Sequence, residues 1–305
     1  MIPLSGPPRP TQAHPGPADR RSQAPNADNP RMNLLALDTG TEFLSIALRT
    51  EGPDGPQLQE HQSAGGARAS TDLIAAVLAM LSHAGVRLSD LDAICFGSGP
   101  GSFTGLRTAC SVVQGLAFGA GVPVLPMDSL LAVAEDARYA AAPDSQDIVV
   151  TALLDARMDE MYAATYRFTQ GHWQTLFPAA LLSPQDLGLA MTPADLPPQP
   201  MQPLQVGKAS HLLAGNVFDV YAGRLPAALL QSAQVVPALP GAAAMLRLAP
   251  EMVAQGLAVD AAQALPHYIR DKVAKTTAER DAEKAQAVSL GAAIPAIGAA
   301  APSAG

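Results

Sequence analysis

The sequence predicts an α/β protein built from two lobes that share one topology. Over residues 33–139, the segments follow the order strand, strand, strand, helix, strand, helix, strand, helix. The opening of this pattern returns from residue 148. A glycine-rich loop at residues 97–105 joins an apolar strand to a long helical segment. Strands that alternate with helices predict sheets covered by helices.

The first half begins with two apolar strands, at residues 33–37 and 43–48, and a third strand follows at 58–62. Apolar residues then recur at helical spacing over residues 71–84. Gly85 marks the end of this helix, because glycine readily adopts the left-handed conformation that follows a helix.

A strand at residues 93–96 leads into the glycine loop, and a helix rich in Ala and Val follows at 106–120. Glycines at alternate positions predict a tight turn from strand to helix. A further strand at residues 122–125 and a helix at 129–139 complete the first half.

The second half repeats the start of the first. In the first half, an apolar strand ends at Asp38, and Glu42 precedes the next strand. In the second half, an apolar strand is expected at residues 148–154 and ends at Asp155, and Glu160 precedes an alternating strand. A repeat of this kind indicates a duplicated domain. The plan is that of the duplicated actin-like/Hsp70-like ATPase (ASKHA, RNase H-like) fold with two lobes.

The remaining segments are short. We expect a strand at residues 234–236 and a helix at 242–255. The other expectations are a long loop at 183–203, a strand at 204–207, a helical turn at 209–214 and an extended piece at 266–270.

These patterns predict four regions. Residues 1–31 are rich in Pro, Ser, Gln and Asn and nearly lack large apolar side chains, which predicts a disordered leader. Residues 32–140 are expected to form the first lobe and 141–275 the second, whose C-terminal part is a candidate to pack back on the first. Residues 276–305 are expected to be a disordered tail.

Composition excludes several classes of protein. The 305-residue chain carries a net charge of −8 with neutral histidines, and its sequence has no basic cluster. We therefore do not expect it to bind nucleic acid by itself. No apolar run reaches about 18 residues, so we expect no membrane span. Its two cysteines, Cys95 and Cys110, lie in apolar runs, which favours buried thiols and a cytoplasmic location.

The glycine loop and the end of the first strand form a candidate phosphate-binding loop. Its residues are Asp38, Thr39, Gly99, Gly101, Ser102, Thr104 and Gly105. The start of a helix attracts anions, and an acid at the end of the first strand orients metal and phosphate in nucleotide-handling relatives of this fold. The alternative is structural, with a tight turn in the loop and Asp38 capping its own turn. The loop matches no P-loop, dinucleotide-binding or nucleophile-elbow motif.

The sequence predicts no metal site and no catalytic residue. Metal sites need clustered ligands, and the histidines that follow residue 60 are scattered without an H-x-x-x-H or H-E-x-x-H motif.

Three linked motifs resemble one family. They lie at residues 35–39 (LALDT), 97–107 (GSGPGSFTGLR) and 154–162 (LDARMDEMY). Together they are similar to the TsaB (YeaZ-type) family, subunits of the bacterial machinery that makes N6-threonylcarbamoyladenosine at position 37 of tRNA. The resemblance extends from about residue 32 to about 275.

This resemblance implies a non-catalytic scaffold. Such subunits form a heterodimer with the catalytic TsaD and recruit the ATPase TsaE, and tRNA is bound only through the complex. ATP or ADP would then lie at the complex interface. TsaD holds its metal with a His-x-x-x-His helix, and the corresponding helix of this chain lacks that motif.

The resemblance also implies where the partner docks. The two helices of the first lobe would pack against those of TsaD, or against a second copy when TsaD is absent. The residues carried over are Leu73, Val77, Met80, Leu81, Arg107, Ser111, Gly115 and Gly119. The last three form a stripe of small residues, which fits either a partner helix or the protein's own sheet.

The alternative function is an ATP-dependent sugar-kinase-like or peptidase-like enzyme of the same fold class. It would use Asp38 together with Ser102 and Thr104 around a nucleotide. A stand-alone tRNA binder conflicts with the acidic charge balance.

Overall fold

The computed structural model describes residues 32–53, 55–65, 69–187 and 211–270. The predicted leader, the predicted tail and the strand expected at residues 204–207 lie outside these ranges.

Five strands form the first sheet, in the order β3-β2-β1-β4-β5. β1 pairs antiparallel with β2 and parallel with β4. β2 pairs antiparallel with β3, and β4 pairs parallel with β5. The strands are β1 Leu34–Asp38, β2 Phe43–Gly52, β3 Gly55–Ala64, β4 Ala93–Gly99 and β5 Val124–Asp128.

The second sheet repeats this topology, with the order β10-β9-β6-β7-β8. β6 pairs antiparallel with β7 and parallel with β9, as β1 does with β2 and β4. The predicted duplicated two-lobe α/β fold is therefore confirmed. The strands are β6 Asp147–Arg157, β7 Glu160–Thr169, β8 His172–Leu182, β9 His211–Gly215 and β10 Gln234–Pro237.

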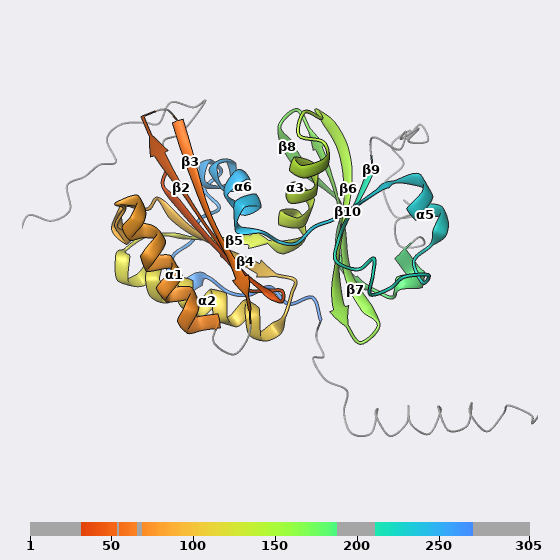
Figure 1. Ribbon diagram of the computed structural model, residues 1–305, viewed down its shortest axis with the longest axis horizontal. Helices are drawn as coiled ribbons and strands as arrows, with labels where there is room; N and C mark the ends of the chain where they lie inside the picture. Colours follow the sequence, from red (N-terminus) through yellow and green to blue (C-terminus); the bar gives the residue numbers. More distant parts are fainter. Residues whose placement is uncertain (1–31, 54, 66–68, 188–210, 271–305) are drawn as a thin grey trace, which may run out of the picture.

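Helices cover both faces of the first sheet (Figure 1). α1 Ala69–Ala84 and α2 Phe103–Ala120 pack on the face that carries Leu35 and Leu37. α6 Ala242–Ala254, from the C-terminal part of the chain, packs on the opposite face. Because both faces of β1 are buried, its sequence is a continuous apolar run rather than an alternating one.

The second sheet is covered on one face by α3 Ser129–Ala141, so that α3 and α6 lie between the two sheets (Figure 1). Its other face packs against a small cluster that includes Val217 and Tyr221. A short helix, α5 Ala227–Ser232, precedes β10. No helix in the described ranges is long and apolar enough to cross a lipid bilayer.

One expectation for the second half was wrong, and one strand was missed. The helical turn expected at residues 209–214 is not formed, because its described part, from His211 onward, is the inner strand β9. The strand β8, which extends from His172 to Leu182, was not among the expected elements. β8 is a partly exposed edge strand with register shifts against β7, which blurs the alternation that reveals a strand.

Candidate functional site

A cleft of about 680 Å³ lies between the two lobes. The first lobe contributes the β1–β2 turn, residues 39–43, and the glycine loop with the start of α2, residues 100–106. The second lobe contributes residues 154–158 from the end of β6, and the C-terminal residues 267–270 complete the lining. The predicted motifs therefore meet at one place in the structure.

The glycine loop lies directly against the β1–β2 turn. The Ser102 N–H donates to the Gly40 carbonyl at 2.7 Å, and the Thr39 hydroxyl donates to the Gly105 carbonyl at 2.7 Å. A Cβ at Gly105 would overlap the carbonyl oxygen of Thr39, and one at Gly101 would lie 2.9 Å from that of Gly40. The glycines thus permit a close backbone approach, which is the structural alternative stated for this loop.

The remaining loop residues are placed around this contact. Gly99 has a φ of 128° and lies against the carbonyl of His267, so a side chain there would be both strained and obstructed. Ser102 caps α2 by accepting from the Gly105 N–H at 3.5 Å. Thr104 is exposed in the first turn of α2. The start of α2 therefore faces the cleft. Its glycines, however, lie against carbonyl oxygens of the β1–β2 turn.

Asp38 lies under the site rather than in it. Its side chain is 1% exposed at the end of β1, and it does not line the cleft. Oδ1 accepts from the Gly40 N–H at 2.9 Å, while Oδ2, beside Gly97, has no hydrogen-bond partner among the described residues. Burial raises the pKa of Asp38 to about 7, more than the Gly40 hydrogen bond lowers it. This geometry fits the turn-capping alternative.

The β6–β7 turn forms the opposite wall of the cleft. Three successive residues, Arg157, Met158 and Asp159, have φ near 60°, which is unusual for residues other than glycine. Asp155 supports the turn by accepting from the Arg157 N–H at 2.9 Å and from the Tyr221 hydroxyl at 2.8 Å. Asp155 therefore caps its own turn, as Asp38 does, and is also held by Tyr221.

Metal-binding residues do not gather in the part of the chain that the structure describes. Within those ranges, no group of three or more His, Cys, Asp or Glu side chains is arranged to hold an ion.

The predicted interface residues of α1 do not lie on its surface. Leu73, Val77, Met80 and Leu81 are buried against the first sheet, so they form the protein's own core. The large apolar side chains of α1 that are exposed, among those the structure describes, are Ile74, at 41%, and Leu78, at 50%. The expectation that those four side chains contact a partner is therefore corrected.

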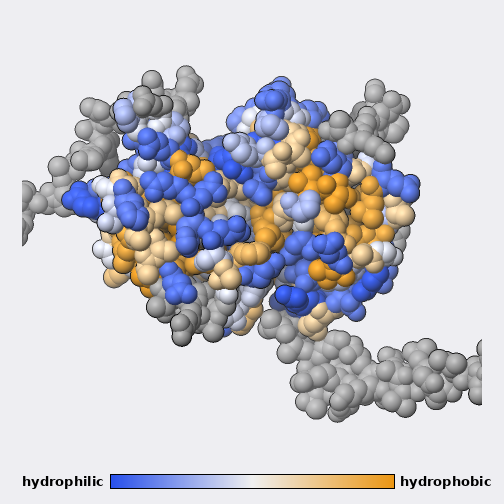
Figure 2. Space-filling view, viewed as in Figure 1, coloured by the Kyte–Doolittle hydropathy of each residue, from blue (hydrophilic) through white to orange (hydrophobic). Residues whose placement is uncertain are grey.

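The small-residue stripe on α2 does lie on the surface. Ser111, Gly115 and Gly119 are exposed, and no described atom lies within 4 Å of a Cβ placed at either glycine. Phe118, beside the stripe, is 83% exposed. The stripe therefore does not pack on the protein's own sheet. On the neighbouring helix α1, Figure 2 shows hydrophobic residues at the surface.

Arg107 lies at the edge of this surface, beside the cleft. Its guanidinium stacks on the Phe103 ring at 3.8 Å, and its Nε donates to the Tyr268 hydroxyl at 3.0 Å. Arg107 thus links α2 to the C-terminal residues.

Comparisons with known proteins find relatives that are named for the threonylcarbamoyladenosine modification of tRNA. Residues 57–278 match the family model described as TsaD, tRNA N6-adenosine threonylcarbamoyltransferase. The chain is 31% identical over 250 residues to the tRNA threonylcarbamoyladenosine biosynthesis protein TsaB of Escherichia coli, covering 80% of this chain and 96% of that one. It is 42% identical over 132 residues to the TsaB of Haemophilus influenzae, which is 43% of this chain and 52% of that one.

A solved structure gives the same result. YeaZ from Pseudomonas aeruginosa superimposes with a TM-score of 0.62 at 36% identity, covering 78% of this chain and 99% of that one.

Proposed function

The chain belongs to the TsaB (YeaZ-type) family of tRNA threonylcarbamoyladenosine biosynthesis, and we propose that it is the non-catalytic scaffold subunit in the formation of t6A37. In this role it dimerises with the catalytic TsaD, recruits the ATPase TsaE and meets tRNA only within the complex, in the cytoplasm. Any ATP or ADP lies at the interface of that complex.

The exposed face of α1 and α2 carries this proposal. No described atom covers the α2 backbone at Gly115 and Gly119, and Phe118 of α2 with Ile74 and Leu78 of α1 adds exposed apolar surface on the same two helices. Small residues let a second helix approach closely, while the apolar side chains supply the area to bury. The equivalent helices of TsaD, a relative of the same fold, are the proposed occupant, with a second copy of this chain as the competing one.

The cleft supports a role without catalysis. A kinase-like reaction needs an acid at the end of β1 that reaches metal or phosphate, and Asp38 is buried below the cleft. The match to the TsaD model extends over α1, but this helix has no His-x-x-x-His motif and contains only His83. Calorimetry with ATP and Mg²⁺ on the isolated chain is expected to show no binding.

Replacement of Leu78 or Gly115 by glutamate is expected to weaken copurification with TsaD. Each change places a charge in a surface that must lose its water, which costs about 2 kcal/mol or more, roughly 30-fold in Kd. Both positions are exposed, so circular dichroism and the melting temperature should stay close to those of the wild type.

Leu58→Glu is the matched control. The exposed fraction of Leu58, 45%, is close to the 50% of Leu78, but Leu58 lies on the edge strand β3. It should leave copurification unchanged. Unaltered TsaD binding in folded Leu78→Glu and Gly115→Glu proteins would remove the proposed docking surface, and loss of self-association alone would assign that surface to a homodimer.

A further inference from the structure

The two lobes exchange their last helices. α3 follows β5 of the first sheet but packs on the second sheet, against the side of β6 that carries Val150 and Ala152. α6 follows β10 of the second sheet but packs on the first, where its first N–H, on Ala242, donates to Ser45 at 3.0 Å. α3 and α6 also contact each other. The lobe boundary therefore runs between these two helices.

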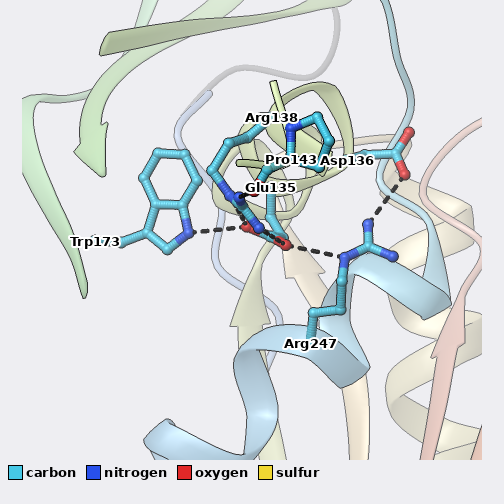
Figure 3. Close-up of polar contacts among 6 residues, drawn as sticks. All are labelled: Glu135, Asp136, Arg138, Pro143, Trp173 and Arg247. Atoms are coloured by element: carbon cyan, nitrogen blue, oxygen red, sulfur yellow. Dashed lines mark hydrogen bonds and ion pairs between the residues drawn. The ribbon is translucent and has the colours of Figure 1, made fainter. Parts of the chain in front are cut away.

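Glu135 lies at this boundary and is 3% exposed (Figure 3). Arg138, one turn later in α3, donates to both carboxylate oxygens at 2.9 Å. Arg247 of α6 donates to Oε1 at 2.9 Å, and the Trp173 indole of β8 donates to Oε2 at 3.2 Å. One buried carboxylate thus joins three elements. α3 and β8 belong to the second lobe, and α6 packs on the first sheet.

The charged side chains of the cluster are all paired with opposite charges. Arg247 also reaches Asp136 at 3.4 Å, so two arginines face two carboxylates. The guanidinium of Arg138 stacks on Phe168, and that of Arg247 stacks on Tyr139. A buried carboxylate with four charge-assisted or indole hydrogen bonds has one favourable geometry, because any rotation leaves a charge unpaired in a medium of low dielectric. The cluster therefore fixes the angle between α3 and α6.

A second tie crosses the cleft. The C-terminal strap, residues 264–270, is held on the first lobe by two hydrogen bonds. Gln114 donates to the Ala264 carbonyl at 2.9 Å, and the His267 N–H donates to the Ser98 carbonyl at 2.7 Å. On the second lobe, Arg270 donates to Glu160 at 2.6 Å and to the Arg157 carbonyl at 3.2 Å. The strap therefore spans from α2 to the strained β6–β7 turn.

We propose that the two lobes form one rigid unit, held by the Glu135 cluster between α3 and α6 and by the C-terminal strap across the cleft, so that the cleft keeps a fixed width. Lobes joined by one contact can rotate about it, whereas two separate ties oppose that rotation. Glu135, Arg247 and Arg270 are then positioning residues. The proposal concerns this chain alone and stands whether or not TsaD docks on α1 and α2.

Distance measurement between spin labels tests this directly. Gln62→Cys on β3 and Gln174→Cys on β8 place one exposed label on each lobe, and the two native cysteines are buried. Electron–electron double resonance should give a single narrow distance distribution that ATP with Mg²⁺ does not shift. A broad or two-peaked distribution in the otherwise wild-type chain, or a shift with nucleotide, overturns the proposal.

Two variants then assign the ties. Arg247→Met and Arg270→Met should each broaden the distribution, and the double variant should broaden it most and move its mean. Arg87→Met is the matched control, since Arg87 pairs with Asp90 within the first lobe and spans no boundary. A folded double variant with the wild-type distribution overturns the assignment to these ties. The wild-type measurement decides rigidity even where a variant fails to fold.

Discussion

Gly105→Ala is expected to destabilise the protein by about 3 kcal/mol or more, or to prevent folding. The new Cβ would occupy the position of the Thr39 carbonyl oxygen, and backbone cannot move aside as a flexible side chain can. Any shift would also break the hydrogen bond from the Thr39 hydroxyl to the Gly105 carbonyl, 2.7 Å long. Urea denaturation of the purified chain measures the loss.

Gly115→Ala is the control on the same helix. A Cβ at Gly115 meets no described atom within 4 Å, and alanine in a helix interior is favoured over glycine by about 0.5–1 kcal/mol. This variant should therefore be slightly more stable than the wild type. Equal effects of the two substitutions would show that helix propensity, and not the contact with the β1–β2 turn, decides the role of Gly105.

The duplicated fold could be predicted because its signals are local. The strand, aspartate and glutamate pattern occurs at Asp38 and again at Asp155, and each copy lies within one short continuous stretch of the sequence. The state of β9 could not be predicted in this way. Its five residues, His211–Gly215, are too short to show a period, and pairing with β6 and β10 makes them a strand.

The four α1 residues that the resemblance placed at a partner surface are buried for a physical reason. Leu73, Val77, Met80 and Leu81 recur at helical spacing and form the most apolar side of the helix, and that side faces the core of a globular protein. The docking surface proposed above uses a second apolar stripe instead, formed by Ile74 and Leu78. Periodicity alone does not separate the two when both are apolar.

The polar ties between the lobes were also invisible in the sequence. Glu135 and Arg138 are three residues apart, which suggests only an ordinary pair on one helix. Arg247 and Trp173 reach the same carboxylate from 112 and 38 residues away. Such partners follow from how the lobes pack, and the packing is known only once the structure is.

Asp38→Asn is expected to remove a large part of the pH dependence of stability. The pKa of Asp38 is about 7 in the folded chain and 3.8 as its ordinary value, so between these values the folded state holds a proton that the unfolded state has lost. The group therefore stabilises the fold at low pH, and this contribution falls as pH rises towards 7. From pH 5 to pH 8 the loss is about 2–3 kcal/mol, since one pKa unit corresponds to about 1.4 kcal/mol.

The comparison between the two proteins isolates this group. Asparagine keeps an oxygen for the Gly40 N–H but does not ionise, and every other titrating group is shared. Urea denaturation at pH 5 and pH 8 should show the variant gaining about 2–3 kcal/mol relative to the wild type at the higher pH, whatever its stability at pH 5. A difference that does not change with pH would mean that Asp38 stays ionised in the fold. An ionised Asp38 would need a cation beside Oδ2, and its structural role would then give way to a site for a positive ligand.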